Sequence, residues 1–189
     1  MSSRTRVESE ERRRRFEKTA LVFLPALFRS ARRLTRDSDR AKDLTQETCL
    51  RAYRTFDNFR PGTNCKAWLL TILYSIFVNQ YRKERREPRT IAIEEPLDER
   101  FAESLAAEPS EPTRWSDAQV VGALDALPES FRSAVILVDV EELTYEEAAA
   151  ALHCPIGTLR SRLFRARKAL SLSLREHARR AGYGGAEKE

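Results

Sequence analysis

Residues 144–170, TYEEAAAALHCPIGTLRSRLFRARKAL, contain two helical patterns with a break between them. The first pattern, Tyr145–Leu152, has a small apolar inner face. Pro155 marks the start of a second helix, because proline is tolerated in the first turn of a helix and disfavoured further in. In that second helix apolar residues recur at spacings of three and four, which predicts one buried stripe made of Ile156, Leu159, Leu163, Ala166 and Leu170.

The other side of the second helix is basic and polar, and it carries Thr158, Arg160, Ser161, Arg162, Arg165 and Lys168. A short helix, a tight turn and a helix with one apolar and one Arg/Ser/Thr face are typical of a helix-turn-helix, whose second helix enters a major groove. An amphipathic hairpin with a solvated basic face shows the same pattern, so this stretch alone leaves DNA binding and a structural role open. Such turns often have Gly at the position that His153 occupies here. Histidine tolerates positive φ better than most residues but less easily than glycine, so a strained turn is expected.

The bulk composition indicates a folded, mostly helical chain with an anionic partner. Its 189 residues are 41% hydrophobic and 33% charged, with a net charge of +5, which favours nucleic acid first and a membrane surface second. Three widely spaced cysteines and two histidines offer no metal-ligand spacing. We therefore expect no metal, no cofactor and reduced thiols in a cytoplasmic protein. The charged N-terminus has no apolar core, and the run 67–78 is too short to span a bilayer.

Ahead of this stretch, the sequence predicts a first helical domain over residues 10–87. Residues 1–10 are expected to be disordered and residues 10–35 to form one helix, kinked at Pro25. A second helix follows over 40–56, with Leu50 facing inward. Asp43, Gln46 and Glu47 cluster within one turn of its exposed side, which is either a solvated face or a polar docking face. A third helix over 67–86 is expected to be central, because its first half is nearly all apolar, whereas its second half is polar and strongly basic.

The loop DNFRPGTNCK, residues 57–66, interleaves aromatic and basic groups, namely Phe59, Arg60 and Lys66. That mixture suits stacking on unpaired bases and pairing with phosphates. Trp68, where the loop meets the helix, is a further candidate. Residues 88–112 are rich in Pro and acidic groups and are expected to be a flexible linker to a second domain over 113–180. Within that second domain Thr144 and Glu147 have the spacing of a capping box.

Two long segments resemble a known family. DLTQETCLRAYRTFDNFRPGTNCKAWLLTIL followed by NQYRKERREP resembles conserved region 2 of the extracytoplasmic-function (ECF, group IV) sigma factors of the sigma-70 family. ALDALPESFRSAVILVDVEELTYEEAAAALHCPIGTLRSRLFRARKAL is similar to their region 4. The resemblance implies an all-α fold of two small helical domains. It also implies a promoter-specificity subunit of bacterial RNA polymerase, which is not an enzyme and has no catalytic residue.

The resemblance also implies which residues would act. Core polymerase would bind Asp43, Gln46 and Glu47. The −35 duplex, of the GGAAC type, would be contacted by Thr158, Arg160, Ser161, Arg162, Phe164 and Arg165. The −10 element, opened and captured as a single strand, would be contacted by Phe59, Arg60, Asn64, Lys66, Trp68, Ser75 and Asn79.

Two positions depart from the family pattern. Thr71 stands where members often carry Arg, and Ser75 where they usually carry Asn. A serine is shorter than asparagine and cannot offer an amide pair, so the resemblance does not specify the −10 base. The family further implies control by a cognate anti-sigma factor. An alternative function is a stand-alone helix-turn-helix regulator, which would bind specific duplex DNA without polymerase. A third possible function is that of a structural adaptor.

Overall fold

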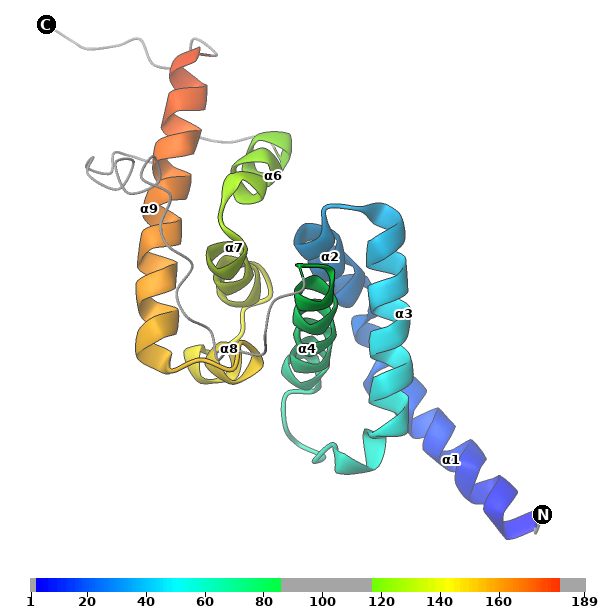
Figure 1. The fold of residues 1–189 in the computed structure, drawn as a ribbon. Coiled ribbons are helices and arrows are strands. Elements are labelled where there is room, and N and C mark those ends of the chain that lie inside the picture. Colours follow the sequence, from blue (N-terminus) through cyan, green and yellow to red (C-terminus); the bar gives the residue numbers. More distant parts are fainter. Residues whose placement is uncertain (1–2, 86–116, 181–189) are drawn as a thin grey trace, which may run out of the picture.

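The structure is a computed structural model that describes residues 3–85 and 117–180 (Figure 1). Within these two ranges every regular element is helical. The predicted acidic linker, residues 88–112, lies outside the described residues. None of the helices in the two ranges is both long and apolar enough to cross a membrane.

The first half of the chain folds around the apolar helix α4 (Cys65–Arg85), whose side chains Leu69, Leu70 and Leu73 are almost completely buried. Helices α2 (Leu24–Thr35) and α3 (Ser38–Arg54) pack against each other and against α4 (Figure 1). The short 3-10 turn η2 (Phe56–Asn58) and the loop to residue 64 connect α3 to α4. The predicted central role of this apolar helix is confirmed.

The predicted single helix over residues 10–35 is wrong. The chain forms α1 (Ser3–Thr19), then the 3-10 turn η1 (Leu21–Phe23), and only then α2. Pro25 lies in the first turn of α2, where its missing N–H leaves no helical hydrogen bond unmade, so it begins a helix instead of kinking one. The expected disorder before residue 10 is also wrong, because α1 starts at Ser3.

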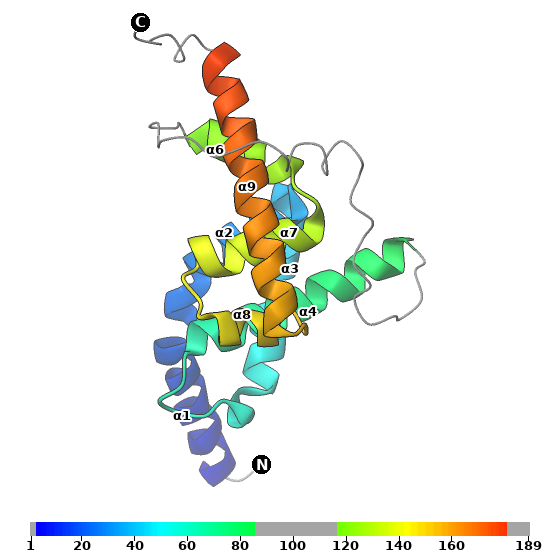
Figure 2. The same ribbon diagram turned by 90° about the vertical axis from the view of Figure 1, so that its left-hand side faces the viewer.

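The second half of the chain is a helical cluster around α9 (Ile156–Arg180). Helices α6 (Asp117–Ala126) and α7 (Glu129–Val135) pack on it, followed by the π-helical turn η3 (Ile136–Val140). The short helix α8 (Tyr145–Ala151) packs near the start of α9, as Figures 1 and 2 both show.

Local signals fix the ends of α8. Thr144 accepts a hydrogen bond from the Glu147 amide (3.2 Å), and the Glu147 carboxylate accepts one from the Thr144 amide (3.0 Å), so the predicted capping box is confirmed. His153 follows α8 with φ of 50°, as expected for this turn. The two predicted helices of the helix-turn-helix are therefore present, joined through a left-handed residue.

The two halves of the chain touch each other. Helix α4 packs against α8, and α2 packs against α7. Their buried residues form one continuous apolar core in which Leu44, Leu70 and Leu73 belong to the first half, and Leu159 and Leu163 to the second. A candidate nucleic-acid-binding residue in one half of the chain can therefore also contact the other half.

Candidate nucleic-acid interface

Helix α9 has a buried face and a face directed to solvent. Four of the residues on the buried face, Leu159, Leu163, Ala166 and Ala169, are nearly inaccessible. On the opposite face Arg160 is exposed, and Phe164 is 70% exposed. An aromatic side chain so far out of the core contributes little to packing, so this face is accessible to another molecule.

The outward face is partly ordered by its neighbours. The guanidinium carbon of Arg160 lies 5.9 Å from the centre of the Tyr145 ring at the start of α8. Ser161 donates a hydrogen bond to the Thr158 carbonyl oxygen (2.9 Å), and both side chains are half-buried, as is Arg165. The structure therefore places Thr158, Arg160, Ser161, Phe164 and Arg165 in the N-terminal part of α9, where Arg160 lies beside the N-terminus of α8.

Arg162 does not lie on this face. Its side chain is 6% exposed, so the expectation that it faces outward is wrong. Position 162 is three residues after Leu159 and four before Ala166, which places it on the edge of the buried stripe. Its charge alone had favoured the outer face. In the structure that charge acts on Tyr74, in the first half of the chain.

Arg167, further along α9, forms an ion pair with Asp139. Its Nη2 and Nε donate to the two carboxylate oxygens of Asp139 at 2.6 and 3.1 Å. This bidentate pair raises the pKa of the Arg167 guanidinium above its ordinary value. It ties α9 to the turn η3, so its role in this structure is to position the helix.

The loop between α3 and α4 is built on three aromatic rings. Phe59 stacks on Phe56 with ring centres 6.0 Å apart and an interplanar angle of 11°, and Trp68 lies 5.2 Å from Phe59. Phe56 is buried, whereas Phe59 and Trp68 are half-buried and keep accessible ring surface. Arg60 is exposed beside them. Aromatic surface next to a cation is the composition that single-stranded nucleic acids bind.

Asn64 has a structural task at this loop. Its Oδ1 accepts a hydrogen bond from the Ala67 amide at 3.1 Å, which caps the first turn of α4. The side chain is still exposed, and its remaining amide group stays available.

Helix α4 presents three of the predicted residues on one line. Trp68, Ser75 and Asn79 are spaced by seven and four, so they share a face of the helix, together with Thr71. Ser75 is half-buried and Asn79 is exposed. Lys66 is excluded from this line, because its position in the helical repeat points about half a turn away.

Lys66 instead reaches the second half of the chain. Its Nζ donates to the backbone carbonyl oxygen of Glu141 at 2.6 Å and lies 3.0 Å from Oε2 of the same residue. The structure therefore separates Lys66 from the other residues predicted to contact the −10 element.

A third surface lies on α3. Asp43, Gln46 and Glu47 are all exposed there, and Glu47 accepts a hydrogen bond from Gln80 of α4 at 2.9 Å. Leu50 lies on the same face and is 51% exposed, so the expectation that it points inward is wrong. Positions 43, 46, 47 and 50 follow helical spacing, and that signal would have placed Leu50 with the polar cluster. An apolar side chain beside three polar ones suits a docking surface better than a solvated one.

Comparison with known proteins separates the chain into the same two halves. The model for Sigma-70 region 2 matches residues 22–87, and that for Sigma-70 region 4 matches residues 117–170. The chain is 42% identical to the ECF RNA polymerase sigma factor EcfG of Rhodopseudomonas palustris over 154 residues, which cover 82% of each protein. It is 33% identical to the ECF RNA polymerase sigma-E factor of Escherichia coli over 144 residues, or 73% of this chain and 75% of that one.

Two solved structures share the fold. The sigma factor RpoE from Bartonella quintana, determined in complex with the anti-sigma factor NepR, has a TM-score of 0.66 and 36% identity, covering 85% of this chain and 96% of that one. CnrH, determined in complex with the cytosolic domain of CnrY, has a TM-score of 0.60 at 23% identity, covering 87% and 90% of the respective chains.

Proposed function

Because the chain belongs to the ECF group of sigma-70 family RNA polymerase sigma factors, we propose that it directs transcription initiation by reading a promoter at two separate points. Core polymerase catalyses RNA synthesis, and this chain recognises the promoter. The observation that carries the proposal is the outward face of α9, where Arg160 and the 70% exposed Phe164 stand opposite the buried Leu159, Leu163 and Ala166.

The −35 element is read as duplex by this face of α9. A helix presents side chains to base edges in the major groove, and Arg160 can donate two hydrogen bonds to guanine O6 and N7. Phe164 can contact a thymine methyl group. Thr158, Ser161 and Arg165 flank them on the same helix, where contacts to phosphates would set the register. A GGAAC-type −35 element, with two adjacent guanines, fits an arginine-bearing face.

The −10 element is captured as a single strand by the loop before α4 and by the line of Trp68, Ser75 and Asn79 on that helix. The accessible surface of the Phe59 and Trp68 rings supports stacking of an unpaired base, since every base has a π-face. Arg60 and Asn64 lie in the same loop, where they can contact the backbone and the base edges of the captured strand.

Core polymerase is held by the exposed face of α3. Asp43, Gln46 and Glu47 supply charge and hydrogen bonds, and Leu50 supplies apolar area beside them. This composition resembles a small docking patch with one apolar anchor and a polar rim.

An anti-sigma factor controls the chain. The support is that the structurally similar RpoE of Bartonella quintana, at 36% identity over most of both chains, was determined with its anti-sigma factor NepR. We infer a regulator of the same kind for this chain.

Run-off transcription with core polymerase on a library of promoters tests the proposal. We expect the chain to select templates that combine a GGAAC-type −35 element with one −10 sequence, and core alone to select none. The competing function, a stand-alone helix-turn-helix regulator, predicts specific duplex binding at nanomolar protein without polymerase and no promoter-dependent transcript. The two outcomes are separated by measuring duplex binding and transcription on the same templates.

A further inference from the structure

We propose that Arg12 of α1 is a positioning residue for the −10 strand, because it fixes the end of α3 and the turn η2, and with them the aromatic rings on which an unpaired base would stack. The rings of Phe56, Phe59 and Trp68 form this aromatic platform. The role in DNA capture rests on the proposed function, whereas the positioning of the rings does not. Helix α1 ends before residue 22, where the match to Sigma-70 region 2 begins, so it lies outside the part of the chain that this family model describes.

Arg12 reaches from α1 to the end of α3. Its Nη2 donates to the backbone carbonyl oxygens of Tyr53 at 2.8 Å and of Arg54 at 3.2 Å, the last two residues of that helix. The same nitrogen lies 3.1 Å from Oδ2 of Asp57 in η2. The guanidinium carbon lies 5.0 Å from the centre of the Tyr53 ring. One cationic nitrogen is thus placed among three oxygens that belong to two consecutive elements.

The end of a helix attracts a cation. The last carbonyl groups of a helix lack N–H partners within it and carry the negative end of the helix dipole. Arg12 places a positive charge at this end of α3 and joins it, through Asp57, to the residue that follows Phe56. Hydrogen bonds are directional whereas apolar packing is not, so these contacts fix the direction in which the chain leaves α3.

Helix α1 also packs against the aromatic platform. Phe16 is 5% exposed, and its ring meets that of Phe56 edge-on with centres 5.2 Å apart. The guanidinium carbon of Arg15 lies 5.9 Å from the centre of the same Phe56 ring. Phe56 in turn stacks on Phe59 and lies 6.3 Å from Trp68. The helix therefore contacts the platform through its buried member.

Phe16 and Arg12 have different tasks in this arrangement. Phe16 buries apolar area and keeps α1 on the domain, whereas the side chain of Arg12 is 31% exposed. Loss of the Arg12 contacts should therefore leave the fold intact and change the orientation of η2 and of the rings. An unpaired base gains from stacking only where a ring presents its face, so a loosened platform binds the strand less tightly.

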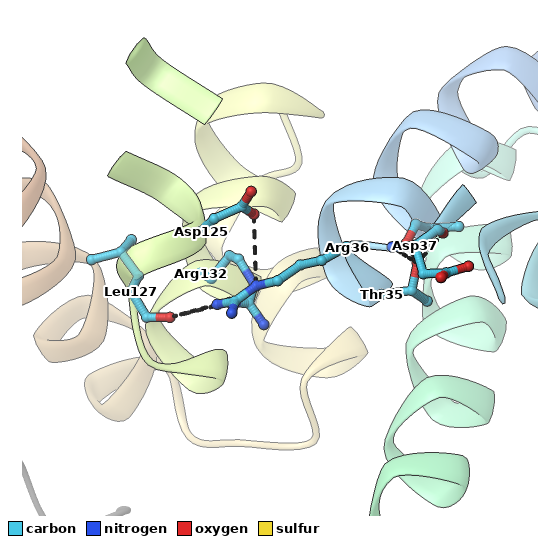
Figure 3. A network of polar contacts seen from close by, with 7 residues as sticks. Thr35, Arg36, Asp37, Asp125, Leu127 and Arg132 are labelled. Carbon is cyan, nitrogen blue, oxygen red and sulfur yellow. Dashed lines mark hydrogen bonds and ion pairs between the residues drawn. The ribbon is translucent and has the colours of Figure 1, made fainter. Parts of the chain in front are cut away.

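A second arginine makes the same kind of contact at another helix end (Figure 3). The Nη2 of Arg36 donates to the carbonyl oxygen of Leu127, one residue past the end of α6, at 3.5 Å, and its Nε lies 3.7 Å from Asp125 Oδ1. These distances are longer than those of Arg12, and the Arg36 side chain is 46% exposed. Arg36 thus offers a matched comparison, with the same contact chemistry at a helix end other than that of the aromatic platform.

The fluorescence of Trp68 tests the positioning without DNA. Trp115→Phe leaves Trp68 as the only tryptophan, since the chain has two. In this background we expect Arg12→Ala to raise the rate constant of acrylamide quenching, because the ring becomes more accessible when η2 is loosened. The controls are Arg13→Ala, at an exposed arginine that pairs within α1, and Arg36→Ala. Both should quench at the rate of the background protein.

Holoenzyme binding tests the role in DNA capture. The probe is a fluorescein-labelled single strand with the −10 sequence that the promoter library selects. Arg12→Ala should weaken binding by about fivefold or more relative to Arg13→Ala, since stacking of one base is worth roughly 5- to 150-fold in affinity. The slope of log affinity against log salt should stay at the wild-type value, because a positioning residue touches no phosphate. Loss of a direct phosphate contact would instead reduce that slope by about 0.7.

Unchanged quenching in a folded Arg12→Ala variant overturns the proposal. Unchanged strand affinity overturns the role in capture, and so does a slope reduced by about 0.7, which would make Arg12 a phosphate contact. Circular dichroism checks the fold. If Arg12→Ala unfolds, Asp57→Asn removes the ion pair from the other side, at a position that is 75% exposed, and its quenching must rise for the proposal to stand.

Wild-type run-off transcription separates this inference from the proposed function. If quenching rises in the Arg12 variant while no promoter fires with the wild-type chain, the sigma-factor function is wrong and the positioning of the rings stands. If promoters fire while quenching is unchanged, the sigma-factor function stands and the role of Arg12 is wrong.

Discussion

The guanidinium of Arg160 lies over the ring of Tyr145, with 5.9 Å between the carbon of the guanidinium and the ring centre. The two residues belong to different helices of the helix-turn-helix. A cation over an aromatic ring at an exposed site gains about 0.5–1 kcal/mol, which is enough to favour one direction for a long side chain. Helix α8 thus orients an arginine of α9 before any DNA is present.

Replacement of Arg160 by Ala should relax the sequence preference of transcription at one −35 position. Loss of a bidentate contact to guanine costs about 1–3 kcal/mol of discrimination, or about 5- to 150-fold. The measurement is run-off transcription on templates with single-base changes in the −35 element. Arg29→Ala, an exposed arginine on α2, should keep the wild-type preference. An unchanged preference in the Arg160 variant would exclude it from base readout.

Changes on the exposed face of α3 should weaken binding to core polymerase without unfolding the chain. We expect Asp43→Arg and Leu50→Glu each to reduce the affinity by at least tenfold, since loss of a dominant interface anchor costs about 2 kcal/mol or more. Fluorescence anisotropy of a labelled chain titrated with core gives the Kd. Glu11→Arg makes a matched charge reversal on α1, also exposed, and should bind as wild type does. Equal affinity for all three variants would remove α3 from the interface.

Replacement of His153 by Gly should stabilise the second domain. The φ of 50° at His153 is a left-handed conformation that glycine adopts without steric cost. Part of that gain is offset because glycine is more flexible in the unfolded chain, so the net change is about 0.5–1 kcal/mol. Urea unfolding measures it. Ala150→Gly, at an exposed position inside α8, should destabilise by about the same amount. A destabilised His153 variant would show that the imidazole makes a contact that outweighs the backbone strain.

The three cysteines should react slowly with iodoacetamide in the folded protein. Burial raises the pKa of Cys49, Cys65 and Cys154 above the ordinary value of 9.0, and only Cys154 has an opposing influence, the charge of Arg162. Because the thiolate is the reactive form, less of it is present at pH 8 than in a free thiol, and the rate keeps rising with pH beyond 9. Mass spectrometry against time gives the rate at each site. A thiol that reacts as fast in the folded protein as in urea contradicts this expectation.

Local signals in the sequence predicted the parts of the fold that depend on neighbours in the chain. The capping box at Thr144, the break before Pro155 and the positive φ at His153 need no knowledge of tertiary contacts, and all three are present. The helical period also predicted the buried stripe of α9. Its first member, Ile156, is still 36% exposed, because the first turn of a helix has fewer neighbours to cover it.

The sequence did not predict the features that depend on distant segments. Lys66 and Glu141 are 75 residues apart, and no local pattern joins them. Arg162 was assigned to the outer face by its charge, although its position adjoins the buried stripe. Leu50 was assigned to the interior by its hydrophobicity, although its spacing places it with Asp43 and Gln46. In the last two cases residue type outweighed helical position, and position was the better guide.

The separation of the two faces of α9 has a consequence for how this protein evolves. Leu159, Leu163 and Ala166 carry the packing, while Arg160 and Phe164 are surrounded by solvent and by other side chains of the same motif. Surface changes away from packing contacts usually alter stability by less than about 0.5 kcal/mol. If the outer face reads the promoter as proposed, one copy of a duplicated gene can therefore acquire new promoters through a few substitutions on that face while its fold is preserved.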